Sequence, residues 1–208
     1  MEYTLIYPKL PDKKYDIIYS DPPWRYDGCA FNSKTGKDHS VKDQYPTLGL
    51  EELAQLPIQN ICKDNCLMFL WATSPKLDMA MDIIPLWGFK FINIAFVWEK
   101  VHCLSGHYTL PSTEIVLTCK KGRIPKPRGS RNERQFLQEK RTVHSRKPVE
   151  IRKRIERMFP TQSKIELFSR RPSDDQWNVW GNQCENSNNA TSTSTSTIND
   201  APLLQFIK

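Results

Sequence analysis

The chain has 208 residues, with 38% hydrophobic and 25% charged residues, which suits one globular domain rather than a fibrous or disordered protein. Its longest apolar runs, at 66–72 and 91–98, are too short to span a membrane. The opening residues MEYTLIYPKLPDKK lack the pattern of a secretory signal. We therefore expect a soluble, cytoplasmic protein.

The net charge of +7 is unevenly distributed along the chain. Residues 120–157 contain 15 of the 30 lysines and arginines against four acidic residues, so this segment carries +11 and the remainder carries −4. Such a segment can follow the phosphates of a nucleic acid. It can equally be a solvated face.

Strand-like segments rich in Val, Ile, Leu and Phe alternate with helix-like segments. Strands are expected at 15–20, 66–72, 90–98, 114–119 and 164–168. Helices are expected at 50–56, 74–88 and 147–159. This alternation is typical of a three-layer α/β domain with a largely parallel sheet.

The helix expected at 74–88 is the longest of the three. Ser74 suits its N-cap, and Leu77, Met81 and Ile84 are expected along one side.

Two polar connections, 25–46 and 120–146, are longer than ordinary connectors and indicate functional or mobile loops. After Gln183 the chain is low in complexity, so we expect a folded domain at 1–183 and a disordered tail at 184–208. The six cysteines are scattered, and we expect reduced thiols and no metal site.

The stretch SDPPWRYD at 20–27 follows the first expected strand. A pair of prolines can simply end a strand. The alternative is a pocket for a planar amine, in which the Asp21 carboxylate accepts one amine hydrogen and the Pro22 carbonyl accepts the other. Such contacts make a delocalised nitrogen more nucleophilic. The prolines fix the backbone, and Trp24 offers a face for stacking.

The chain contains neither GxGxxG nor GxxxxGK[ST], so a phosphate cradle is unsupported. S-adenosylmethionine needs no such cradle, and its sulfonium is already an activated methyl donor. The protein must then mainly align the acceptor. An adenine amine inside a duplex would be reached by extruding the base.

Eight stretches occur in order, namely DPPW at 21–24, QYPTL at 44–48, MFLWAT at 68–73, VWEK at 97–100, STEIVL at 112–117, HSRKP at 144–148, KIELFSR at 164–170 and WGNQ at 180–183. Together they resemble the MT-A family of adenine-N6 methyltransferases, named for the catalytic subunit of the mRNA adenosine enzyme. The resemblance covers roughly residues 15–183. It implies a Rossmann-like, three-layer methyltransferase domain that uses S-adenosylmethionine and has a permuted order, with the catalytic motif first.

The resemblance also implies roles for single residues. The catalytic set is Asp21, Pro22, Pro23 and Trp24. The cofactor set is Asp21, Lys147, Glu166, Arg170, Asn182 and Gln183. The set near the target base is Tyr45, Glu114, Ser145 and Lys147. From the basic segment we add Arg128, Arg131, Arg134 and Arg141 as phosphate contacts.

The sequence departs from the family pattern after Arg170, where it runs RPSDD in place of a His–Asn contact. The roles of Arg171 and Ser173 therefore stay open.

One short catalytic domain without an RNA-recognition module favours DNA as the substrate, as in stand-alone bacterial and phage members. The chain would then be a site-specific adenine-N6 DNA methyltransferase. An RNA N6-adenosine methyltransferase is the first alternative, and a catalytically silent nucleic-acid-binding subunit is the second. A silent subunit need not keep DPPW together with Asn182 and Gln183. This chain has all of them, which favours an active enzyme. We expect no membrane contact, while a protein partner or a homodimer stays open.

Overall fold

The computed structural model describes residues 7–26, 31–32, 37–38, 47–101, 108–141 and 146–182. Its strands are β1 (Tyr15–Ser20), β2 (Phe31–Asn32), β3 (Lys37–Asp38), β4 (Cys62–Thr73), β5 (Lys90–Glu99), β6 (Thr113–Lys121), β7 (Phe136–Gln138), β8 (Lys164–Leu167) and β9 (Asn178–Trp180). Its α-helices are α1 (Leu50–Ala54), α2 (Leu77–Leu86) and α3 (Val149–Met158), with 3₁₀ turns at Ile58–Ile61 and Ser74–Lys76.

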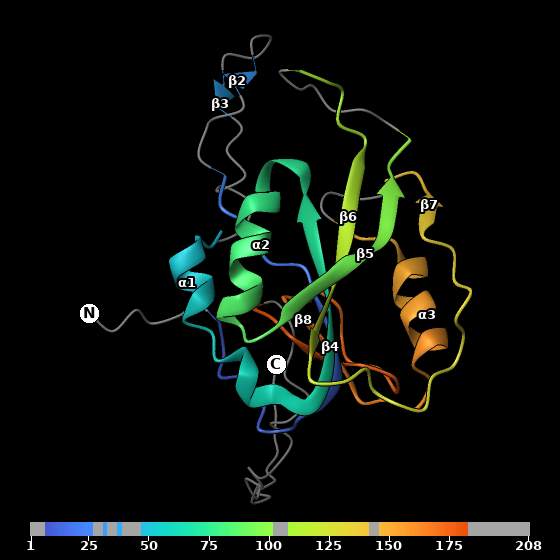
Figure 1. The fold of residues 1–208 in the computed structure, drawn as a ribbon. Coiled ribbons are helices and arrows are strands. Elements are labelled where there is room, and N and C mark those ends of the chain that lie inside the picture. The colour runs from blue at the N-terminus through green and yellow to red at the C-terminus, as the bar shows by residue number, and fades with distance from the viewer. Residues whose placement is uncertain are drawn as a thin grey trace, which may run out of the picture.

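Seven strands form one sheet in the order β7-β5-β6-β4-β1-β8-β9. The pairs β1–β4, β1–β8, β8–β9 and β5–β7 are parallel, and only β6 runs against its neighbours. Helices α1 and α2 lie on one face and α3 on the other (Figure 1). The α/β, Rossmann-like fold with a largely parallel sheet is thus confirmed.

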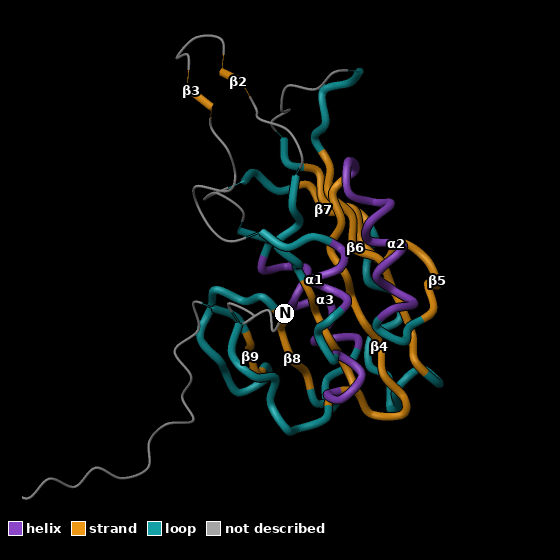
Figure 2. Tube along the Cα trace, turned by 90° about the vertical axis from the view of Figure 1, so that its left-hand side faces the viewer, coloured by secondary structure: helices purple, strands orange, loops and turns teal. Residues whose placement is uncertain are grey.

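Strand β8 lies beside β1 although it comes late in the chain, and Figure 2 shows it with β9 at one edge of the sheet. This is the permuted order, in which the first strand stands near the centre. Within the described ranges, no helix has the length and apolar character needed to cross a lipid bilayer.

The core consists of two apolar clusters, one on each face of the sheet. Strand side chains alternate in direction, so Met68 and Leu70 of β4 pack toward α1 and α2, while Phe69 and Trp71 pack toward α3. Burial on both faces explains why β4 is an almost continuous apolar run.

Helix α2 differs from its expected form. The 3₁₀ turn means that Ser74 does not cap the α-helix, which begins at Leu77. Leu77 and Met81 are 37% and 39% exposed, whereas Ala80 and Ile83 are buried along with Ile84. The expected buried face was wrong because the apolar residues of α2 lie on several sides of the helix. A 3.6-residue period therefore fits more than one candidate face.

Helix α3 lies within its expected range, 147–159. It begins after Pro148, and Ile151 and Ile155 are fully buried against the sheet. The fixed backbone angle of Pro148 suits the start of a helix. Lys147 therefore stands just ahead of α3 rather than inside it.

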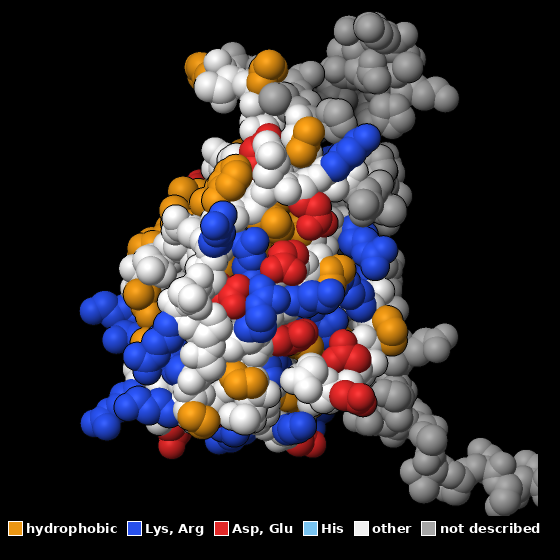
Figure 3. All heavy atoms as spheres, turned by 90° about the vertical axis from the view of Figure 1, so that its right-hand side faces the viewer, with side chains coloured by type: hydrophobic (Ala, Val, Ile, Leu, Met, Phe, Trp, Pro, Cys, Tyr) orange, Lys and Arg blue, Asp and Glu red, His pale blue; other side chains and the backbone are white. Residues whose placement is uncertain are grey.

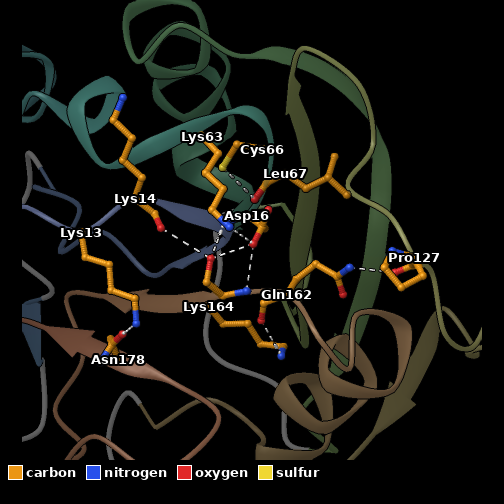
Figure 4. A network of polar contacts seen from close by, with 11 residues as sticks. Lys13, Lys14, Asp16, Lys63, Cys66, Leu67, Pro127, Gln162, Lys164 and Asn178 are labelled. Carbon is orange, nitrogen blue, oxygen red and sulfur yellow. Dashed lines mark hydrogen bonds and ion pairs between the residues drawn. The ribbon is translucent and has the colours of Figure 1, made fainter.

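At the amino edge of the sheet, Asp16 joins three elements (Figure 4). Its Oδ2 accepts hydrogen bonds from the Ser163 backbone at 2.9 Å and the Ser163 hydroxyl at 2.7 Å, and it pairs with Lys63 Nζ at 2.6 Å. Partial burial raises the pKa of Asp16, but the bonds from Lys63 and Ser163 outweigh burial and leave the pKa below its usual value. Asp16 thus joins β1 and β4 to the start of β8.

We expect Asp16→Ala to lower the free energy of unfolding by about 1–3 kcal/mol at neutral pH, because the donors of Ser163 lose their acceptor. The pKa of Asp16 is lower in the folded chain than in the unfolded chain, so its contribution is present above the unfolded-state pKa. It is lost as pH falls through the folded-state pKa. Urea unfolding should show the deficit of the variant narrowing at acid pH, and a deficit independent of pH would contradict this role.

Candidate active site at the carboxyl edge of the sheet

Five chain segments place polar side chains at the carboxyl edge of the sheet. Asp21 follows β1, Lys100 follows β5 and Arg170 comes shortly after β8. Glu114 lies at the start of the antiparallel strand β6, which begins where its neighbours end. Lys147 approaches the same edge from the turn before α3. Ligands of open α/β sheets bind at this edge.

Two adjoining cavities open here. The first, called the DPPW cavity, has a volume of ≈ 120 Å³ and is lined by Pro22, Pro23 and Trp24, together with Trp71, Glu114 and Asn182 among others. The second, called the Glu166 cavity, has a volume of ≈ 420 Å³ and is lined by Tyr19, Glu166, Ser169 and Arg171 among others. Both are also lined by Asp21, Lys147, Phe168 and Arg170. The larger volume falls within the roughly 300–1,000 Å³ typical of small-molecule sites.

Four charged side chains of alternating sign form a chain of ion pairs. Lys147 Nζ lies 2.8 Å from Asp21 Oδ1 and 3.1 Å from Glu114 Oε2. Lys100 Nζ lies 2.7 Å from the other oxygen, Glu114 Oε1. The side chains of Lys100, Glu114 and Lys147 are at most 13% exposed, and that of Asp21 is 30% exposed. Each charge is therefore compensated by a neighbour of opposite sign.

Burial and pairing set the protonation of this chain. Burial raises the pKa of Asp21, and Lys147 offsets only part of that effect. Burial also acts to raise the pKa of Glu114, but Lys147 and Lys100 outweigh it and lower that pKa. Burial acts to lower the pKa of Lys147, yet Asp21 and Glu114 raise it well above its usual value. Burial therefore dominates the pKa of Asp21, whereas ion pairing dominates the pKa values of Glu114 and Lys147.

The DPPW turn is fixed by its own backbone. The Trp24 N–H donates to the Pro22 carbonyl at 2.8 Å, which closes a tight turn centred on Pro23. The Leu48 N–H donates to the Pro23 carbonyl, also at 2.8 Å. A carbonyl oxygen has two lone pairs, so Pro22 can still accept a second hydrogen bond. Trp24 is buried yet lines the cavity, and its Nε1 has no hydrogen-bond partner among the described residues.

Lys147 is held from two further directions. Arg171 Nη2 donates to the Lys147 carbonyl at 2.9 Å, so the residue whose role the sequence left open anchors this backbone. The Lys147 ammonium lies 5.2 Å from the Trp71 ring centre, and Trp71 Nε1 donates to the Tyr19 hydroxyl at 2.7 Å. None of Arg171, Trp71 and Lys100 was assigned to the site from the sequence. Lys100 could have been found, because it ends the VWEK stretch at the carboxyl end of a strand, where ligands bind.

Glu166 lies on β8 beside its own cavity. Burial raises its pKa, which Arg152 and Arg171 partly offset. Its Oε2 is 3.5 Å from Arg152 Nε but accepts no hydrogen bond from the described residues. A buried carboxylate oxygen in this state is a candidate acceptor for a ligand hydroxyl.

The four arginines expected to contact phosphate do not form one cluster. Arg128 and Arg131 line a separate cavity near Phe159, and the Arg128 guanidinium lies 5.3 Å from the Phe159 ring centre. Arg134 is exposed beside α3, and Arg141 follows β7 toward the carboxyl edge.

Figure 3 views the side of α3 and β7, where lysine and arginine side chains gather with acidic side chains between them. Arg157 pairs here with Glu133 and Glu150, both at 2.8 Å. Part of the positive charge in the basic segment is thus already compensated within the fold.

Tyr45, Ser145 and Gln183 lie outside the described residues. Among the residues that the structure describes, no group of three His, Cys, Asp or Glu side chains could hold a metal ion. Cys62, Cys66 and Cys119 are free and buried, as expected.

The MT-A70 family model matches residues 15–183. The chain is 43% identical over 188 residues to the type II methyltransferase M.MunI of Mycoplasma sp, covering 85% of this chain and 80% of that protein. It is 29% identical over 185 residues to the human N(6)-adenosine-methyltransferase catalytic subunit METTL3, covering 83% of this chain and 28% of METTL3.

A Drosophila melanogaster N(6)-adenosine-methyltransferase MT-A70-like protein is also 29% identical, over 182 residues that cover 83% of this chain and 27% of that protein. The chain thus spans most of M.MunI but little more than a quarter of these two longer relatives. Since the family model and M.MunI both match most of its length, the chain belongs to the MT-A70 family.

Proposed function

We propose that this chain transfers a methyl group from S-adenosylmethionine to the N6 amine of adenine in DNA. The observation that carries the proposal is the position of Asp21, which lines both cavities beside the DPPW turn and pairs with a buried lysine. The names of relatives add support, since METTL3 is an N(6)-adenosine methyltransferase and M.MunI is a type II methyltransferase. We assign the catalytic domain to residues 1–183 and treat 184–208 as an accessory tail.

The residues at the Glu166 cavity fit S-adenosylmethionine in charge and in size. Asp21 and Lys147 offer opposite charges for the amino and carboxylate groups of its amino acid end. Glu166 Oε2, buried and without a hydrogen bond from the described residues, suits a ribose hydroxyl. Arg170 and Asn182, with Gln183, would hold the ribose and adenine.

When bound, the cofactor supplies an activated methyl group on its sulfonium. The Asp21 carboxylate accepts one hydrogen of the adenine amine, and the free lone pair of the Pro22 carbonyl accepts the other. These contacts favour a nitrogen whose lone pair can attack in line. A methylated amine nitrogen must lose a proton, and Asp21 would be the adjacent acceptor. The Lys147 ammonium favours the ionised form of Asp21 before the transfer.

DNA is favoured over RNA because the chain is 43% identical to the type II methyltransferase M.MunI but only 29% identical to the N(6)-adenosine methyltransferase METTL3. A silent nucleic-acid-binding subunit is less favoured, because such a role needs neither the DPPW turn nor the pairing of Asp21 with a buried lysine.

The proposal is tested by incubating the protein with methyl-labelled S-adenosylmethionine and matched pools of duplex DNA, single-stranded DNA and RNA, followed by nucleoside analysis. We expect labelled N6-methyladenine in DNA. Asp21→Asn should abolish the label, because an amide can present N–H to a donor that needs an acceptor. Label in RNA alone would establish the first alternative, and no label in any pool would favour the silent subunit. Full activity of a folded Asp21→Asn protein would overturn the role of Asp21.

Arg170→Ala and Asn182→Ala should weaken the binding of S-adenosylmethionine measured by calorimetry. Arg170 lines both cavities, and Asn182 lines the adjoining DPPW cavity at a position that the family resemblance assigns to the cofactor. Asn178→Ala is the matched control. Asn178 lies on β9, accepts a hydrogen bond from Lys13 and lines neither cavity. The control should bind as the parent does. Unaltered affinity in both test variants would place the cofactor elsewhere.

Replacing Arg131, Arg134 and Arg141 with alanine should weaken duplex binding and flatten its salt dependence, by up to ~0.9 in the logarithmic slope for each phosphate that is no longer neutralised. Arg128 is left in place because it packs on Phe159. Binding is measured by fluorescence anisotropy across a salt series.

The control for this experiment replaces Lys9, Lys14 and Lys90, which are exposed and lie outside the basic segment, and so removes the same charge. The control should keep the slope of the parent. Equal slopes in the arginine variant, the control and the parent would identify the basic segment as a solvated face.

A further inference from the structure

Lys100 is a buried lysine that lines neither cavity. It is the first residue after β5, and its N–H donates to the Ser112 carbonyl at 2.8 Å. Its ammonium lies 2.7 Å from Glu114 Oε1 and 5.7 Å from the Trp98 ring centre. Burying an ammonium is costly unless it is paired. The function of Lys100 should therefore depend on its partner, Glu114.

That partner, Glu114, stands between two lysines. Lys100 holds one of its oxygens and Lys147 approaches the other at 3.1 Å, while Lys147 is closer to Asp21, at 2.8 Å. With Lys100 present, the negative charge of Glu114 is already compensated from the far side. The Lys147 ammonium is then available to Asp21.

We propose that Lys100 is a positioning residue of the methyl-transfer site, which holds Glu114 so that Lys147 stays committed to Asp21 and Asp21 stays ionised. The role in methyl transfer rests on the proposed function. The coupling between Lys100 and Asp21 does not, because it follows from the ion pairs alone. Without Lys100, Glu114 would draw on Lys147 as its only cation in the chain of four.

The charged and titratable groups around Asp21 fix the sign of the effect. They are Lys147 before α3, Glu114 on β6, Arg170 after β8, Glu166 on β8 and Tyr19 on β1. Burial keeps the Tyr19 phenol neutral by raising its pKa well above the usual value. Of these groups, two are cations and two are carboxylates, and all four lie around Asp21. Removing the charge that compensates Glu114 shifts this balance toward the anions, and the proton affinity of Asp21 rises.

The test is a titration of the Asp21 carboxyl carbon by NMR in ¹³C-aspartate-labelled protein, with no cofactor or nucleic acid present. The signal is assigned with Asp21→Asn. Lys100→Met should move the Asp21 midpoint to higher pH, by less than the roughly tenfold or greater change in proton affinity that a contacting cation produces. Lys100→Arg, which keeps the charge, should restore the midpoint.

Lys63→Met is the matched control, because Lys63 makes an ion pair of 2.6 Å with Asp16 at the opposite edge of the sheet (Figure 4). It should leave the Asp21 midpoint unchanged. A second variant, Glu114→Gln, removes an anion facing Asp21 and should move the midpoint to lower pH, which keeps the test decisive if Lys100→Met does not fold. An unchanged Asp21 midpoint in folded Lys100→Met, or an unchanged one in Glu114→Gln, overturns the proposal.

A second readout separates this proposal from the proposed function. In Lys100→Met the acid limb of the methyl-transfer rate against pH should move to higher pH, while kcat at alkaline pH is largely kept. A merely structural lysine would lower the rate equally at every pH, and that result overturns the positioning role. If the midpoint of Asp21 moves but the parent protein methylates nothing, the coupling stands and the proposed function fails.

Discussion

The contact between Lys147 and Asp21 is the interaction on which the candidate site depends. It joins the loop after the first strand to the turn before α3, and so closes the carboxyl edge between early and late segments of the chain. Both cavities are lined by this pair. Breaking a pair of this kind by removing one partner leaves a poorly solvated charge, which is strongly destabilising. The same contact therefore serves stability and places a carboxylate where a ligand can reach it.

Around that contact the fold distributes charge so that no carboxylate is left alone. Glu114 has two lysines, and Glu166 has Arg152. Asp21 combines a raised pKa with a side chain that is 30% exposed and lines both cavities. On the proposed function this suits a proton acceptor, because burial favours protonation of the carboxyl group while Lys147 favours its ionised form.

Much of this arrangement could be predicted from the sequence, because it depends on local patterns. Buried strands gave continuous apolar runs, and the DPPW turn, Glu114 and Arg170 lie at strand ends where ligands bind. Arg171 could not be found this way, since its role depends on which loop lies beside it. Lys100 ends the VWEK stretch at a strand end, but its pairing with Glu114 depends on which strand lies beside β5. A count of charges also cannot show that Arg128 packs on a ring or that Arg157 pairs with two glutamates. Trp71 belongs to the core and to the site at once, because it is buried and also lines the DPPW cavity. A residue that the sequence places in the core can therefore still line a cavity.

The size of the DPPW cavity bears on how a substrate would be chosen. At ≈ 120 Å³ it is well below the range typical of whole ligand sites, so it suits one flat group rather than a nucleoside with its sugar. Adenine is the same base in DNA and RNA, and the 2′-hydroxyl that separates them would remain outside. On the proposed function, the choice between the two is therefore made by the surface around the cavity. Of the basic segment, Arg146 and Lys147 line the Glu166 cavity at the carboxyl edge, whereas Arg131 lines the separate cavity near Phe159, so the part of the segment that lies nearest the base is the one at Arg146 and Lys147.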